Sequence, residues 1–375
     1  MHDTESLLKL LPGCEPTDYD SAADHEAWLR GRRFTLGASD IATAMGASGY
    51  KSAARLSLEK RGKAEPKPIP PGFAKWGHRL EPQILEVWAE ENDLSPVYHN
   101  TRTVRCKREG LSFLTCTPDG LWPSETARAE DGSIVQSRSV ELVQVKTKGT
   151  WDDWKDPEKG IPVEYQIQIQ AELAVTGAEF HNLVWLDLIP REVHWVRIPR
   201  VEAFIQRMVL AAATFWECVQ AGELPPVEAT KDAYQALALA FPQVEEKTVE
   251  LEDGDAYADE LTAIRDELKL LEDRERVIKS LVIRTLEDAR IGLMPSGRYF
   301  STPLISETTV SCKHCGGELY TKAPQRQVRL QKARKKKHQK PIATLQLAAL
   351  ESRGILAAQT DESGEAPPND EESEG

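Results

Sequence analysis

The chain has 375 residues, of which 40% are hydrophobic and 29% are charged, a composition typical of globular proteins. It contains no run of about 18 apolar residues and no basic start followed by an apolar core, so neither a membrane helix nor a secretory signal is expected. The net charge of −13 does not exclude a nucleic-acid ligand, because residues 361–375 are acidic whereas residues 326–340 are basic.

Helical spacing predicts helices within residues 21–60, with a turn at 37–39 where Ser39 would cap a helix that begins at Asp40. The remaining expected helices are 76–92, 162–177 and 201–221. The expected strands are 97–105, 111–122 and 140–146, with a hairpin-like excursion at 124–137 and a final hairpin of 183–188 and 193–198. This order predicts an α/β fold in which a mixed central sheet is flanked by helices.

Composition divides the chain into segments around this α/β domain, which spans 21–221. The others are an N-terminal lead (1–20), a linker (222–246), a helical or coiled-coil extension (247–300), a CxxC hairpin (301–323), a basic arm with a short helix (324–358) and a disordered acidic tail (359–375). The extension has a heptad-like apolar seam interrupted by Glu275, which predicts packing on its own domain or on another subunit. The basic arm either tracks a DNA backbone or is solvated.

The six cysteines are too scattered for a disulfide framework, which predicts a reducing cytoplasm. Cys312 and Cys315 form the CxxC motif. A structural zinc ion needs four ligands, so this motif is interpreted either as two free thiols in a turn or as part of a zinc site that is completed from elsewhere.

A candidate catalytic group lies in the predicted sheet. Asp119 ends one strand in a Pro-Asp-Gly turn, and alternation places Gln144 and Lys146 on one face of the strand at 140–146. The Asp119 carboxylate, the Gln144 amide oxygen and the Val145 carbonyl are hard oxygen ligands suited to Mg²⁺, with Mn²⁺ as a substitute. Lys146 could orient or deprotonate a water molecule. Either the turn or the lysine alone is usually structural; together they indicate metal-assisted phosphodiester hydrolysis.

Four ordered blocks of sequence resemble the YqaJ-like viral recombinases, the phage nucleases of lambda exonuclease type within the PD-(D/E)xK superfamily. These blocks are Trp28–Asp40 with its continuation to Lys60-Arg-Gly, Gly77–Pro82, Asp119 with Gln144–Thr147, and Tyr165–Gly177. The resemblance covers roughly residues 25–190. It implies a restriction-endonuclease-like fold.

The resemblance also implies roles for individual residues. Glu81 would be a further metal ligand and Gln168 an active-site residue. The remaining matched residues would contact DNA or its phosphates: Arg32, Ser39, Tyr165 and Gln170. The implied activity is 5′→3′ digestion of one strand of double-stranded DNA from a free end, supplying single strands to an annealing protein in recombination. The implied assembly is a ring-forming homo-oligomer, such as a trimer, and the implied location is the cytoplasm of a bacterium or a phage-infected host.

One departure from the motif is Gln144, where glutamate is usual. An amide oxygen can bind Mg²⁺ but lacks the charge that strengthens binding, so a weaker metal site is expected. Glu141 should face the other side of the strand and cannot replace it. The alternatives are an endonuclease of the same superfamily and a DNA-binding or scaffolding protein with a lapsed metal site. A relative of the CRISPR-associated exonucleases would need a four-cysteine iron–sulfur site, which these cysteines do not supply.

Overall fold

The computed structural model describes residues 4–331 except 69, 95, 125, 129–133, 138, 149–159, 189–190, 244, 307 and 312–317. These residues form two compact units that divide between residues 244 and 245. The CxxC cysteines, Cys312 and Cys315, lie outside the described residues, as do the run of bases from 332 onward and the acidic tail. In the part of the chain that is described, no helix is long and apolar enough to cross a membrane.

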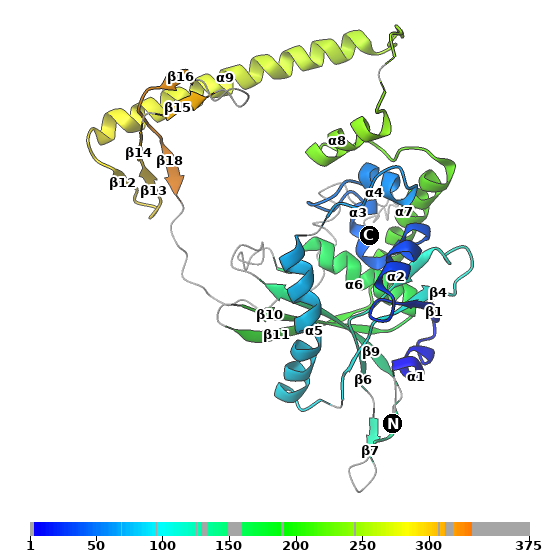
Figure 1. Ribbon diagram of the computed structural model, residues 1–375. Helices are drawn as coiled ribbons and strands as arrows, with labels where there is room; N and C mark the ends of the chain where they lie inside the picture. Colours follow the sequence, from blue (N-terminus) through cyan, green and yellow to red (C-terminus); the bar gives the residue numbers. More distant parts are fainter. Residues whose placement is uncertain are drawn as a thin grey trace, which may run out of the picture. The chain divides into compact units, whose positions relative to one another are not determined.

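The first unit is built on two sheets (Figure 1). The larger sheet has the strand order β11 (Glu192–Pro199), β10 (Phe180–Asp187), β9 (Val140–Lys148), β6 (Gly120–Pro123) and β3 (Tyr98–His99). Its β9 and β10 are parallel, and its other pairs are antiparallel. The smaller sheet has the order β1 (Cys14–Asp20), β4 (Arg102–Cys106), β5 (Leu114–Cys116) and β2 (Leu36–Gly37). Strands β7 (Thr126–Arg128) and β8 (Ile134–Ser137) form a separate hairpin.

Helices cover the larger sheet on both faces. Alternation along β9 sends Val143 and Val145 toward α5 (Pro71–Glu91), where Trp88 is fully buried. It sends Leu142 into the main core, to which α6 (Val163–Thr176), α3 (Ala38–Ala44) and α7 (Glu202–Ala221) contribute. The expected mixed sheet flanked by helices is therefore confirmed.

Proline and glycine set the limits of α6, the helix that carries Gln168. Pro162 is its N-cap, where the missing N–H of proline leaves no unsatisfied donor. Gly177 ends it in the left-handed region with φ of 74°, which a side chain would disfavour. The amide of Gly13 donates to the Thr176 carbonyl at 2.8 Å, and this close approach leaves no space for a Cβ atom at Gly13.

The N-terminal region corrects one expectation. It contains α1 (Thr4–Lys9), α2 (His25–Gly31), a 3-10 turn (Arg32–Phe34) and α4 (Ala53–Lys60). Ser39 is not an N-cap, because α3 begins at Ala38 and its N-cap is Gly37. The reason is that Leu36 and Gly37 pair with β5 as a short strand, so the chain enters the helix directly from the sheet.

The segment expected as a linker contains a helix, α8 (Lys231–Ala240), with Thr230 as its N-cap. Ala236 of α8 is buried against Ala54 and Leu58 of α4, so this segment is part of the first unit. The sequence of α8 is rich in alanine and leucine, but it lacks a long apolar stripe. Only the tertiary contact with α4 makes its small buried face evident.

The second unit consists of one long helix and short strands. Helix α9 spans Gly254–Leu286, shorter than the helical segment expected to continue to residue 300. Strands follow it: β12 (Ile291–Leu293), β13 (Tyr299–Ser301) and β18 (Arg329–Gln331) form one sheet, and β14 (Leu304–Ile305) pairs with β17 (Gln325–Arg326). Strands β15 (Thr308–Ser311) and β16 (Glu318–Lys322) make a hairpin that flanks the CxxC residues.

Candidate active site

Asp119 lies in the turn between β5 and β6. The side-chain amide of Asn100 donates to the Pro118 carbonyl at 2.8 Å, and the backbone amide of Asn100 donates to the Asp119 carbonyl at 2.9 Å. These bonds fix the turn. The Asp119 Oδ2 atom accepts hydrogen bonds from the backbone amide of Val145, at 2.8 Å, and from the side-chain amide of Gln144. The structure thus brings together the two parts of the candidate motif, which are separated by two dozen residues in the sequence.

A chain of hydrogen bonds extends from Gln144 into the core. The Gln168 amide nitrogen donates to Gln144 Oε1 at 2.7 Å and to Glu172 Oε1 at 3.0 Å. Glu172 Oε2 lies 2.8 Å from His181 Nε2, and both residues are buried. Our sequence reasoning missed Glu172 and His181. The available signal for Glu172 was its position one helical turn after Gln168.

Lys146 and Tyr165 lie side by side at this site. Strand β9 places Lys146 on the same face as Gln144, and its Nζ atom is 5.2 Å from the centre of the Tyr165 ring on α6. A cation at this distance is attracted to the face of an aromatic ring. Tyr165 lies on α6, nearly one helical turn before Gln168, and its ring therefore helps to hold the lysine in place.

Glu81, on α5, is the second carboxylate of the site. Its oxygens lie 3.4 Å from His78 Nδ1 and 3.6 Å from His99 Nε2. Burial alone would raise the pKa of Glu81, but the two histidines and the charge of Lys146 outweigh burial and lower that pKa below its usual value. Glu81 is therefore held as an anion.

Asp119 behaves in the opposite way. Burial, with added repulsion from Glu81 and Glu172, raises the pKa of Asp119 to about 7, although Lys146 and the Val145 amide favour its ionised form. The ionised form of Asp119 is therefore not fully compensated by nearby positive charge, and a divalent cation would supply the missing charge.

The donor atoms fit a hard cation. Glu81 and Asp119 offer carboxylate oxygens, and Gln144 and Val145 offer an amide and a backbone carbonyl oxygen, as Mg²⁺ prefers. No cluster of three or more His, Cys, Asp or Glu side chains suited to a metal occurs among the described residues. That agrees with the presence of glutamine at 144, since a glutamate there would supply a third carboxylate. Gln144 Oε1 accepts from Gln168 in this structure, so it would have to exchange that bond to become a ligand.

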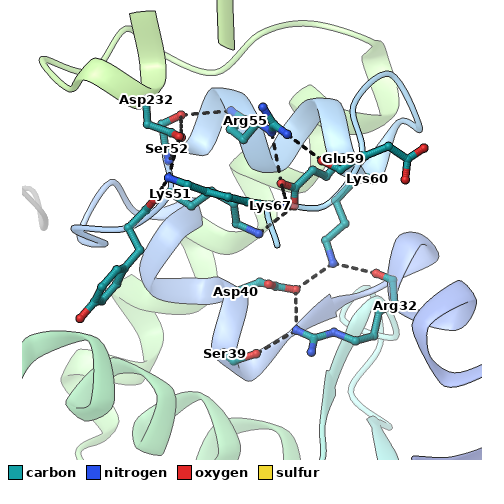
Figure 2. A network of polar contacts seen from close by, with 12 residues as sticks. Arg32, Ser39, Asp40, Lys51, Ser52, Arg55, Glu59, Lys60, Lys67 and Asp232 are labelled. Carbon is teal, nitrogen blue, oxygen red and sulfur yellow. Dashed lines mark hydrogen bonds and ion pairs between the residues drawn. The ribbon is translucent and has the colours of Figure 1, made fainter. Parts of the chain in front are cut away.

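A second group of polar residues surrounds Arg32 (Figure 2). Arg32 Nη2 donates to Ser39 Oγ at 2.9 Å and lies 3.3 Å from Asp40 Oδ2, while its guanidinium carbon is 5.0 Å from the Trp28 ring centre. The buried Lys60 donates to Asp40 at 2.8 Å and to the Arg32 carbonyl at 2.7 Å. Burial opposes ionisation of Asp40, yet the charges of Lys60, Arg32 and Lys51 hold its pKa well below the usual range. The arrangement fixes a partly exposed guanidinium.

The same network continues to the start of α4 (Figure 2). Asp232 accepts from the backbone amide and hydroxyl of Ser52, at 2.8 and 2.9 Å, and Glu228 accepts from the Ala53 amide at 2.6 Å. Acids from the segment 222–246 therefore occupy the positive end of this helix. Our sequence reasoning missed this contact, because about 180 residues separate the two segments.

Gln170 is not part of either group. It is completely buried, and its amide bridges the Pro199 carbonyl and the Val201 amide at 2.8 and 2.9 Å. Its expected contact with DNA or phosphate is therefore corrected to a structural link between α6 and the start of α7. Glu141 faces away from Gln144, as expected, and pairs with Arg197 at 2.7 Å.

The chain is similar to known proteins over much of its length. A family model, the YqaJ-like viral recombinase domain, matches residues 27–179. The uncharacterized protein YqaJ of Bacillus subtilis (strain 168) is 22% identical over 296 residues, covering 76% of this chain and 86% of that protein.

Two solved structures cover about half of this chain. The alkaline exonuclease LHK-Exo of Laribacter hongkongensis is 21% identical, with a TM-score of 0.40, over 52% of this chain and 93% of that one. A phage-related exonuclease from Haemophilus somnus 129PT is 16% identical, with a TM-score of 0.36, over 50% and 96%.

Proposed function

Since residues 27–179 carry a YqaJ-like viral recombinase domain, we propose that this chain is a divalent-metal-dependent DNA nuclease. The observation that carries the proposal is the contact of Asp119 with Gln144 and Val145, beside Glu81 and Lys146. Two partly buried carboxylates, an amide and a lysine at the end of a sheet are the groups that phosphodiester hydrolysis with a metal requires.

Each residue then has a role. Glu81, Asp119, Gln144 and the Val145 carbonyl would hold Mg²⁺ or Mn²⁺, which when bound polarises the phosphate and lowers the pKa of a water molecule. Lys146 orients the attacking water and offsets the negative charge of the transition state. Gln168 positions Gln144, and Tyr165 positions Lys146.

Arg32 and Ser39 support a phosphate site. The guanidinium is fixed by Asp40 and Ser39 through Nη2, which leaves other N–H groups to bond a phosphate. We propose 5′→3′ exonuclease action on double-stranded DNA with free ends, by analogy with the lambda-exonuclease type. By the same analogy, we propose a ring-forming homo-oligomer that works with a single-strand annealing protein.

Duplex DNA labelled at either end, incubated with Mg²⁺ or with chelator, tests this proposal. Nicked and closed circles should accompany the linear substrate. The variants are Lys146→Ala and, as a matched control, Lys148→Ala, which removes a lysine two residues later that pairs with Asp187 at 3.1 Å. We expect digestion from linear ends that chelator and Lys146→Ala abolish and Lys148→Ala retains. Cuts in closed circles would indicate an endonuclease. DNA binding without metal-dependent cleavage of any substrate would indicate a lapsed, binding-only protein.

A further inference from the structure

Helix α9 exposes a long apolar seam. The helix has 33 residues, none of which is buried in the described structure. The seam residues are between 45% and 57% exposed: Tyr257, Leu261, Ile264, Leu268, Leu271 and Ile278. A helix of this kind gains most of its stability from packing its apolar face. We therefore expect a second element to pack against the seam.

The spacing of the seam defines what would fit. Its positions follow one another at intervals of four and three residues, with Glu275 between Leu271 and Ile278, which is the pattern of the central positions of a two-stranded coiled coil. We propose that α9 forms an antiparallel coiled coil with α9 of a second copy of this chain. The contact needs nothing from the nuclease activity and does not rest on it.

Charges beside the seam select the antiparallel direction. When Leu268 faces Leu271 of the second copy, Glu267 faces Arg274 and Arg265 faces Glu272. Twofold symmetry repeats both contacts, so four pairs of opposite charge flank the seam.

A parallel pairing would do the reverse. Glu267 would face Glu272, Arg274 would face Lys279, and the two copies of Glu275 would meet in the seam. Only the pair of Glu260 with Arg265 would be attractive. Because like charges at these positions disfavour a pairing, the pattern favours the antiparallel over the parallel arrangement and supports a second copy of α9 as the occupant.

The size of the seam suffices for a specific contact. From Tyr257 to Ile278 it extends for about 32 Å at 1.5 Å per residue. Two such faces would bury roughly 1,000 Å², which reaches the lower limit of specific interfaces.

Glu275 is the one charged residue within the seam. In the antiparallel pairing it would face Ile264 of the second copy, and it would keep its ion pair with Lys279, at 2.9 Å. A polar residue in the seam weakens a coiled coil but fixes its register.

Sedimentation equilibrium of the full-length chain tests the proposal through paired charge reversals. Glu267→Arg and Arg274→Glu each place like charges opposite one another in the antiparallel dimer, so each should raise the dissociation constant roughly tenfold. The double variant restores opposite charges and should restore the affinity. Positions three and four residues from Glu267 and Arg274 are uncharged, so these substitutions break no ion pair within the helix.

Asp266→Arg is the matched control, because it reverses a charge on the outer face and should leave the affinity unchanged. Glu275→Leu should tighten association. Wild-type assemblies should contain an even number of chains, including six if trimeric rings also form. Single reversals that tighten association would indicate the parallel direction and overturn the proposal. A monomeric wild type at micromolar concentration, or an affinity unchanged in all seam variants, would also overturn it.

Discussion

Glu172 Oε2 lies 2.8 Å from His181 Nε2, and solvent reaches neither side chain. A carboxylate oxygen accepts this hydrogen bond, so Gln168 must present its amide nitrogen to Glu172. That nitrogen also donates to Gln144 Oε1, which leaves the Gln144 nitrogen to donate to Asp119. The buried pair therefore sets the direction of every hydrogen bond up to Asp119.

Glu172→Gln tests this chain of bonds. A glutamine at 172 can donate as well as accept, so Gln168 and Gln144 would lose their fixed orientation and cleavage should fall roughly tenfold. Weakening the hydrogen bond to the buried His181 should also lower the free energy of unfolding by about 2 kcal/mol. Cleavage rates at saturating Mg²⁺ and denaturant unfolding measure the two effects.

Glu141→Gln is its matched control. Like Glu172, Glu141 is buried and hydrogen-bonded, in its case to Arg197 and Asn182. It lies on the face of β9 opposite to Gln144, away from the candidate active site. We expect a similar loss of stability with cleavage near the wild-type rate. Equal losses of cleavage in both variants would show that the Glu172 effect is general destabilisation.

Asp119→Asn should stabilise the metal-free protein at high pH. Folding raises the pKa of Asp119 from 3.8 to about 7, so the folded state binds this proton more tightly. The resulting contribution to stability is fully present below pH 3.8 and is lost as the pH rises to about 7. In chelator at pH 8, the variant should melt roughly 5 °C above wild type, and the gap should shrink toward pH 4. Adding Mg²⁺ should raise the melting temperature of wild type only. A variant less stable than wild type at pH 8 would contradict the inference that the ionised Asp119 carboxylate destabilises the metal-free protein.

The sequence was sufficient for relationships within one element. Strand alternation alone separated Gln144 and Lys146 from Glu141, and the structure has the same arrangement. Helical geometry could also have excluded Gln170 from the site, because it lies about 200° around α6 from Gln168.

Relationships between elements were harder to predict. His181 reaches Glu172 because β10 returns beside β9 after α6, and no local pattern specifies which residues of the strand and the helix then meet. Asp232 and Glu228 reach the start of α4 from a segment that looked like a linker. In each case a tertiary contact gives a polar residue its role. Such contacts leave no periodic signal in the sequence.

Gln144→Glu should strengthen metal binding. It adds a third carboxylate next to Glu81 and Asp119, so the Mg²⁺ concentration for half-maximal binding should fall roughly tenfold. Without metal, repulsion between the new carboxylate and Asp119 should lower the melting temperature at pH 8. Gln144→Met keeps the volume but removes the oxygen, and should weaken binding. Calorimetric titration with Mg²⁺ at pH 8 measures all three proteins. The same affinity in all three would show that residue 144 is not a ligand.

Arg32→Lys should impair recognition of a terminal phosphate. Lysine keeps the positive charge but cannot bond Ser39, Asp40 and a phosphate at once from one planar group. We expect KM for 5′-phosphorylated duplex ends to rise roughly tenfold, with little change for 5′-hydroxyl ends. Arg33→Lys, at the exposed neighbouring position, is the control and should leave both constants unchanged. Steady-state kinetics on the two substrates measures the difference. An equal effect on both kinds of end would show that Arg32 binds the DNA backbone generally, since a terminal phosphate site must discriminate between them.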